Sequence, residues 1–116
     1  MEKKEAGNKY ELVVIVESKL TGDEKESIYK EVTETIIKGG GKIINSHVWL
    51  ERQRLTFPIK RQHEGTYYLI NFEAPGPLAK KMDPVLRLNE RLLRYLITHV
   101  ESHTTLAAGK GTTHHS

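Results

Sequence analysis

The chain has 116 residues, which is enough for one domain with a hydrophobic core but not for two. Hydrophobic residues make up 37% of it and charged residues 28%, a composition typical of a soluble globular protein. No run approaches the roughly 18 apolar residues that cross a bilayer, and the charged opening MEKKEAGNK lacks the apolar segment of a secretory signal. The lack of cysteine excludes disulfides, thiolate catalysis and cysteine-based zinc sites, and we expect a cytoplasmic protein.

The net charge of +3 is unevenly distributed along the chain. Residues 1–50 contain eight lysines and nine acidic residues, whereas residues 51–116 contain ten basic and six acidic residues. All the arginines lie in this second part: Arg52, Arg54, Arg61, Arg87, Arg91 and Arg94. Guanidinium groups bind phosphates through paired hydrogen bonds and stack on bases. The distribution therefore favours a nucleic-acid partner, with a mixed, solvated surface as the alternative.

The first third of the chain predicts a strand and a helix. Residues 1–8 are expected to form a flexible polar lead. Residues 10–16 form an apolar run of strand length, typical of a central strand that is covered on both faces. Thr21 and Glu24 then match a capping box, which places the start of a helix there. Its apolar residues give one stripe for packing on a sheet, at Ile28, Val32 and Ile36. Glycines 39–41 should end the helix, because glycine accepts the left-handed backbone of a helix C-terminus.

Residues 42–74 predict two strands joined by a polar, basic connection. The first strand is expected around Ile43–Leu50 and the second at Tyr67–Phe72, where β-branched and aromatic residues gather. Pro58 lacks a backbone N–H, which places it at an exposed edge or a bulge. The connection alternates basic and apolar residues: Arg52, Arg54, Lys60, Arg61 and His63 with Leu55, Phe57 and Ile59. We interpret this segment as an RNA-facing hairpin with apolar anchors.

The last part of the chain predicts a second helix, a strand and a tail. Residues 74–77 (Ala-Pro-Gly-Pro) end the second hairpin strand and open a helix whose apolar side is expected at Leu78, Met82, Val85 and Leu86. Pro84 should kink this helix or end it early. The final strand is expected at residues 92–100, with one face formed by Leu93, Tyr95 and Ile97. Residues 9–101 are then the folded domain, and residues 102–116, rich in Ser, Thr, Gly and His, are expected to form a disordered tail.

The order strand, helix, strand, strand, helix, strand predicts an α+β protein with the ferredoxin-like fold. Two right-handed βαβ units merge in this fold into a four-stranded antiparallel sheet with both helices on one face. The other face is left open for binding, but the fold does not specify the ligand.

The chain resembles the family of bacterial small-ribosomal-subunit protein six over residues 9–101. The matching segments are LTFPI (55–59), YYLINFEAP (67–75) and LRLNERLLRYLITHV (86–100), supported by KYELVVIV (9–16). The resemblance implies a structural protein that binds the central domain of 16S rRNA, in the platform of the small subunit, as a heterodimer with small-subunit protein eighteen. By residue match it also implies RNA contacts at Arg61, Tyr67 and Arg94. The chain departs from the Trp-Gly pattern of the family at Trp49-Leu50-Glu51, which leaves open whether Arg52 or Arg54 faces the RNA.

Two kinds of contact are expected on the hairpin and the sheet. The residues expected to bind RNA are Arg52, Arg54, Lys60, Arg61, Tyr67 and Arg94. Tyr67 and Tyr68 point to opposite faces, so one of them should belong to the core. Residues 65–70 lack the glycine-aromatic pattern of RNA-recognition motifs, and we do not expect a single strand to be read across the sheet. The partner-binding surface is expected at Trp49, Leu55 and Phe57, with burial of Trp49 in the core as the alternative. The isolated chain should be a monomer.

No catalytic, cofactor or metal site is expected. The histidines lack metal-ligand spacing, and glycines 39–41 precede a strand where a phosphate-binding loop would precede a helix. An acylphosphatase-like enzyme would need an arginine in the loop after the first strand, where the sequence is Glu17-Ser18-Lys19-Leu20. A dimeric ligand-sensing domain of the same topology is the remaining alternative.

Overall fold

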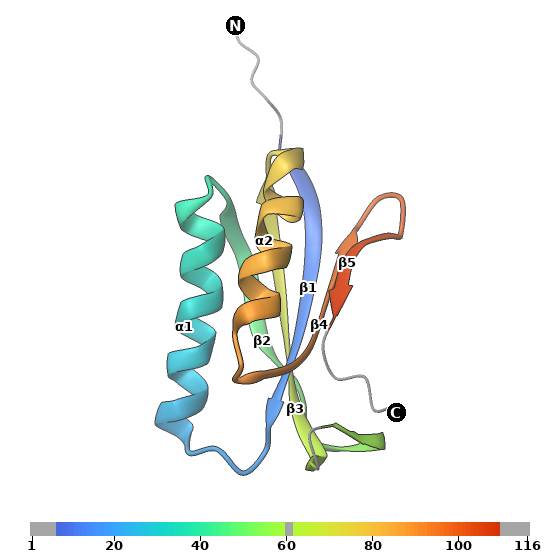
Figure 1. Ribbon diagram of the computed structural model, residues 1–116. Helices are drawn as coiled ribbons and strands as arrows, with labels where there is room; N and C mark the ends of the chain where they lie inside the picture. Colours follow the sequence, from blue (N-terminus) through green and yellow to red (C-terminus); the bar gives the residue numbers. More distant parts are fainter. Residues whose placement is uncertain (1–6, 60–61, 110–116) are drawn as a thin grey trace, which may run out of the picture.

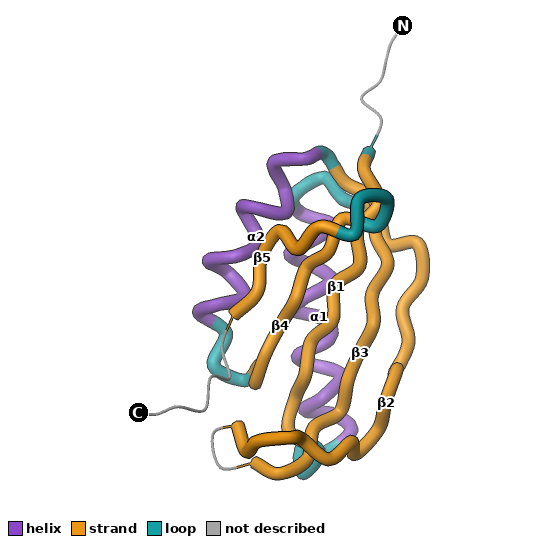
Figure 2. Tube along the Cα trace, turned by 90° about the vertical axis from the view of Figure 1, so that its right-hand side faces the viewer, coloured by secondary structure: helices purple, strands orange, loops and turns teal. Residues whose placement is uncertain are grey.

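The computed structural model describes residues 7–59 and 62–109, without the side chains of residues 49–52 and 56–58. The elements in chain order are β1 (Asn8–Glu17), α1 (Gly22–Lys38), β2 (Lys42–Ile59), β3 (Gln62–Ala74), α2 (Gly76–Leu88), β4 (Leu92–His99) and β5 (Thr104–Gly109). The strands form one antiparallel sheet in the order β2-β3-β1-β4-β5. Both helices cover the same face of the sheet (Figure 1), and the opposite face is open (Figure 2). Neither helix is long and apolar enough to cross a membrane, within the part of the chain that the structure describes.

The ferredoxin-like order of elements is confirmed, but the prediction of four strands is wrong by one. The additional strand, β5, pairs with β4 from Tyr95↔Gly109 to His99↔Thr104. It lies within the segment for which the sequence predicts disorder, because alanine and glycine are depleted in strands and fill half of TTLAAG. Backbone pairing with the edge of β4 gives this segment the order that its side-chain pattern does not indicate.

The ends of α1 follow the sequence signals closely. The Thr21 hydroxyl accepts a hydrogen bond from the backbone N–H of Glu24 at 3.1 Å, and the Glu24 carboxylate accepts one from the backbone N–H of Thr21 at 2.9 Å. Both halves of the predicted capping box are therefore present. At the other end Gly40 takes a positive φ of 93°, which confirms the glycine stop. The predicted apolar stripe is buried: Ile28, Val32 and Ile36.

The second helix extends further than the sequence predicts, and its buried face lacks one of the predicted residues. α2 continues through Pro84 to Leu88, so the proline does not end it early. Pro84 is exposed, and so is Lys80, whose carbonyl loses its helical donor and can be solvated instead. Val85 is 49% exposed and lies outside the buried face on which it was predicted. The buried side chains of α2 are Leu78, Ala79, Met82 and Leu86.

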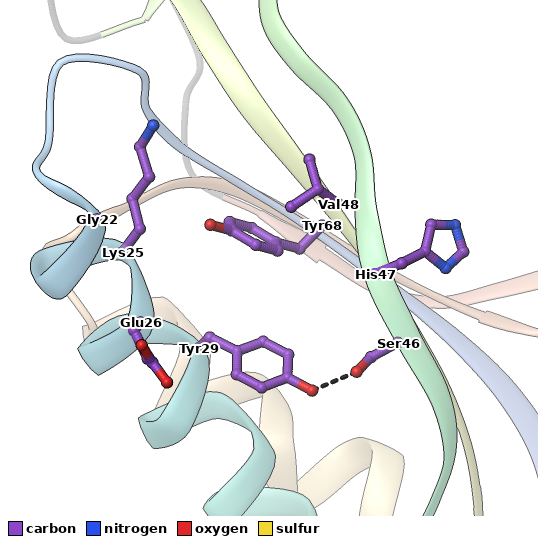
Figure 3. Close-up of a pocket in the computed structure, with 8 residues that line it drawn as sticks. All are labelled: Gly22, Lys25, Glu26, Tyr29, Ser46, His47, Val48 and Tyr68. Atoms are coloured by element: carbon purple, nitrogen blue, oxygen red, sulfur yellow. Dashed lines mark hydrogen bonds between the residues drawn. The ribbon is translucent and has the colours of Figure 1, made fainter.

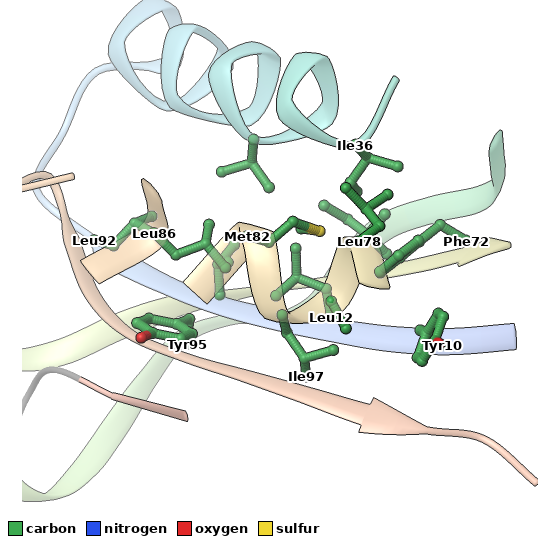
Figure 4. Packing of buried hydrophobic residues seen from close by; sticks show 14 of the residues in the cluster. Tyr10, Leu12, Ile36, Phe72, Leu78, Met82, Leu86, Leu92, Tyr95 and Ile97 are labelled. Carbon is green, nitrogen blue, oxygen red and sulfur yellow. The ribbon is translucent and has the colours of Figure 1, made fainter. Parts of the chain in front are cut away.

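The main core lies between the helices and the sheet (Figure 4). β1 is the central strand, and Tyr10, Leu12 and Val14 are buried on its helix-covered face. Tyr10 stacks on Phe72 of β3 with ring centroids 5.3 Å apart. On the opposite face of β1 only Ile15 is buried among the described side chains, so the strand is not covered on both faces as predicted.

The strands of the β2–β3 hairpin are longer than predicted, because they extend through the expected polar connection. β2 has 18 residues and β3 has 13. Their ladder runs from Lys42↔Glu73 to Ile59↔Gln62 and is interrupted by register shifts. The far end of the hairpin turns across the lower end of the open sheet face, below β1 and β4 (Figure 2).

Candidate nucleic-acid interface

Three side chains from neighbouring strands form a row on the open face of the sheet. The registers place both Tyr67 of β3 and Arg94 of β4 opposite Ile15 of β1. Adjacent strands lie about 4.8 Å apart, so Tyr67 and Arg94 flank Ile15 across roughly 10 Å. Arg94 is exposed and Tyr67 is half-buried. The structure therefore brings together two of the residues that were predicted to contact RNA.

A bulge in β4 lies immediately before Arg94. The register shifts by one residue beside Ile15, which leaves Leu93 as the extra residue in β4. Tyr95 packs in the main core, whereas Leu93 packs with Ile15 on the open side. The prediction that Leu93 and Tyr95 share a face is therefore wrong, because strict alternation does not continue through a bulge.

The hairpin packs on the same end of the open face. A small apolar cluster, separate from the main core, joins the hairpin to β1 and β4: Ile15, Leu55, Ile59, Tyr67 and Leu93. Gly65 permits this close approach, because a Cβ there would lie 2.5 Å from Cγ2 of Ile15. Leu55 is thus partly buried within its own chain. Its contact with a partner stays a prediction, limited to the surface that remains accessible.

The other predicted hairpin residues are described only in part. Arg54 is exposed and lies opposite Glu64 in the ladder. Residues 49–52 and 56–58 belong to β2, but the side chains of Trp49, Arg52 and Phe57 lie outside the description. Residues 60 and 61, the predicted RNA contacts Lys60 and Arg61, are outside the described residues altogether. The ladder shifts register on both sides of residue 50, so its irregular part coincides with the departure from the Trp-Gly pattern.

Two further arginines form ion pairs on the helical side of the molecule. Arg91 forms an ion pair with Glu31 of α1 at 2.5 Å, and Arg87 forms one with Asp83 of α2 at 3.2 Å. The hydrogen bond from Arg91 holds the pKa of Glu31 below its ordinary value. The arginines that are clustered in the sequence therefore do not form one basic surface in the structure.

Tyr95 connects α2 and β5 to the sheet. Its hydroxyl donates a hydrogen bond to the carboxylate of Asp83. Burial of the phenol, together with this hydrogen bond, raises the pKa of Tyr95 to about 12. The same bond is the main cause that lowers the pKa of Asp83. Gly109 lies against the ring, since a Cβ there would be 2.8 Å from the Tyr95 hydroxyl oxygen. The arrangement stabilises the packing of three elements and offers no substrate site.

Sequence reasoning missed a groove of about 410 Å³ between α1 and the edge strand β2. Tyr29 and Tyr68 line it with ring centroids 6.1 Å apart, and the hydroxyls of Tyr29 and Ser46 share a hydrogen bond (Figure 3). Lys25 and Glu26 lie along the helix side of the groove (Figure 3). The alternation of Tyr67 and Tyr68 was the available signal, because it directs Tyr68 toward the helices. No group of three or more histidine, cysteine or acidic side chains that could hold a metal occurs in residues 7–59 and 62–109.

These features define a ferredoxin-like binding domain with one covered sheet face, one open face and a long hairpin. The family model of ribosomal protein S6 matches residues 9–99. Small ribosomal subunit protein bS6 of Dictyoglomus turgidum is 33% identical over 93 residues, which cover 80% of this chain and 95% of the relative. The bS6 protein of an Arthrobacter species is 35% identical over 98 residues, which cover 84% and 96%. The chain belongs to the ribosomal protein S6 family.

A solved structure agrees with the fold. The crystal structure of 30S ribosomal protein S6 from Thermotoga maritima matches with a TM-score of 0.73 at 21% identity, covering 80% of this chain and 87% of the other. The family model and the bS6 relatives confirm the predicted family. Its members are structural proteins of the small ribosomal subunit and not enzymes, which removes the acylphosphatase-like alternative and places the protein on the cytoplasmic ribosome.

Proposed function

We propose that the protein binds the central domain of 16S rRNA as a heterodimer with small-subunit protein eighteen. The observation that supports this most is the row of Tyr67, Ile15 and Arg94 on the open face, beside the hairpin that carries Arg54. An aromatic ring and two exposed guanidinium groups near one end of the sheet suit folded RNA better than a small polar substrate.

The proposed mechanism combines phosphate neutralisation with base stacking. Arg54 and Arg94 bind phosphates and release counterions, and Arg52, Lys60 and Arg61 extend this basic set along the hairpin. Tyr67 stacks on a base. Phosphate contacts fix the position of the protein on the RNA, and the shape of the folded RNA supplies the selectivity.

The proposed partner surface lies on the hairpin and the adjoining sheet edge. β2 is the edge strand, and its side chains Ile44 and Val48 are 47% and 44% exposed. Trp49, Leu55 and Phe57 complete the apolar contact in this proposal. Without the partner the chain is a monomer, which sedimentation of the isolated protein tests.

The test is a binding titration with a central-domain 16S rRNA fragment, with and without the partner, over a series of salt concentrations. We expect tighter binding with the partner and a slope that becomes shallower by about one for each phosphate contact removed in Arg54→Ala and Arg94→Ala. Arg87→Ala is the matched control, because Arg87 is paired with Asp83 on the helical side. Binding that ignores the partner, or that does not respond to salt, contradicts the proposal.

A further inference from the structure

The open face of the sheet contains a hollow of about 310 Å³ above β3, β1 and β4. This volume is at the lower end of the range of about 300–1,000 Å³ that is usual for small-molecule sites. Its lining comes from the three strands: Glu11, Val13, Ile15, Tyr67, Arg94, Tyr95, Leu96 and Thr98. The strands that form the hollow face the viewer in Figure 2, in front of the helices.

The walls of the hollow differ in chemistry from one side to the other. On one side are the ring of Tyr67 and the guanidinium of Arg94, in the row through Ile15. The next row, Val13 opposite Leu96, is apolar, and Leu96 is 37% exposed although β4 is an internal strand. The row beyond it is polar: Glu11 with its ladder partner Thr98.

We propose that this hollow takes a single unpaired base of the ribosomal RNA; the inference rests on the proposed function and assigns it a binding site. Bases in RNA–protein complexes stack on aromatic rings and on arginine planes. Tyr67 and Arg94 lie on either side of Ile15 in one wall of the hollow. The apolar row of Val13 and Leu96 receives the flat surface of the base. The polar row supplies hydrogen-bond donors and acceptors for its edge.

The hairpin prepares Tyr67 for this role. Tyr67 lines the hollow and also belongs to the small cluster with Leu55 and Ile59. Packing against the hairpin holds the ring in place before RNA arrives, which reduces the entropy lost on binding. The site takes only one base, because Tyr67 is the only tyrosine, tryptophan or phenylalanine side chain that the described residues place on this face. This agrees with the missing pattern of RNA-recognition motifs.

The test uses the full chain and two RNA probes, single-stranded hexaadenylate and a twelve-base-pair duplex, followed by nuclear magnetic resonance. Hexaadenylate should shift the amide signals of Val13, Tyr67 and Leu96, and the duplex should leave them unchanged. Tyr67→Leu keeps the apolar volume but removes the ring, and it should weaken hexaadenylate binding roughly 5- to 150-fold. Tyr67→Phe should bind like the wild type.

A second pair of variants tests Arg94 without relying on Tyr67. Arg94→Lys keeps the charge and loses the planar group, so it should weaken hexaadenylate binding several-fold. Lys80→Arg, on the exposed surface of α2, should have no effect. This pair decides the question if Tyr67→Leu does not fold.

The outcomes separate this inference from the proposed function. If the wild type binds the rRNA fragment with its partner, but Tyr67→Leu or Arg94→Lys binds hexaadenylate as well as the wild type does, the single-base site is wrong and the proposed function stands. If the signals of Val13 and Leu96 respond to the partner protein and not to hexaadenylate, the hollow is a protein contact and the inference is also overturned.

Discussion

The two faces of the sheet are formed by the same strands, but their side chains serve different purposes. On the helix-covered face Leu12 is fully buried, and it packs in one continuous core with both helices. On the open face Ile15 is covered by the hairpin, while Val13 and Leu96 remain partly accessible. Both faces of the sheet contain apolar side chains, although the open face also contains Glu11, Arg94 and Thr98. What separates them is the cover that other segments provide, and this cover decides which side chains stabilise the fold and which remain available for binding.

The largest expected difference between the faces is in stability. Leu12→Ala leaves a cavity in the main core and should lower the free energy of unfolding by about 2–5 kcal/mol. Leu96→Ala, at 37% exposure, should cost under about 1 kcal/mol. Urea denaturation of both variants measures the difference. Equal losses would show that the open face is packed as tightly as the covered one.

Gly65 tests the contact that closes the end of the open face. Gly65→Ala places a methyl group 2.5 Å from Cγ2 of Ile15, so one of the two segments must move. Such overpacking costs about 1–3 kcal/mol. Because Ile15→Ala removes the clashing atom, the double variant should lose less stability than the two single losses combined. Strict additivity in denaturation experiments would contradict the close approach.

The Tyr95 phenol tests how α2 and β5 are held on the covered side. Its pKa of about 12 in the folded protein lies above the ordinary value of 10.0, so folding favours the protonated form. This contribution to stability is complete below pH 10 and is lost as the pH rises through about 12, with a slope of at most about 1.4 kcal/mol per pH unit. Tyr95→Phe should remove this part of the pH dependence. An unchanged pH profile between pH 9 and 12 would show that the phenol is not protected.

Most of the covered face could be predicted from the sequence, because its signals are local. The capping box at Thr21, the glycine stop and the stripe of α1 each depend on residues a few positions apart. The fifth strand could not be predicted, since residues 104–109 owe their order to pairing with β4 and not to their own propensity. Leu93 was placed on the wrong face for a similar reason, because a bulge appears only when β4 is aligned with β1.

The candidate site was predictable in its residues but not in its geometry. Tyr67 and Arg94 were selected through the family resemblance, and the cross-strand register that joins them through Ile15 required the fold. The hollow beside them was not predicted, because its lining comes from three strands whose registers the sequence does not show. The count of arginines was misleading, because it grouped Arg87 with the hairpin arginines. In the structure Arg87 is paired with Asp83 on the same helix.

The smallest expected effect in stability, and the clearest contrast between the two sides, comes from two arginines three positions apart. Arg91 is paired with Glu31 at a site where both side chains are about half exposed (41% and 50%), so Arg91→Ala should cost at most about 1 kcal/mol in unfolding and leave binding to the rRNA fragment unchanged. Arg94→Ala should weaken binding to the rRNA fragment, because the register places Arg94 on the open side of the sheet. Denaturation and salt-dependent RNA titration of both variants give four values. Weaker RNA binding by Arg91→Ala would mean that the helical side also faces RNA, and the functional division between the two faces would then be wrong.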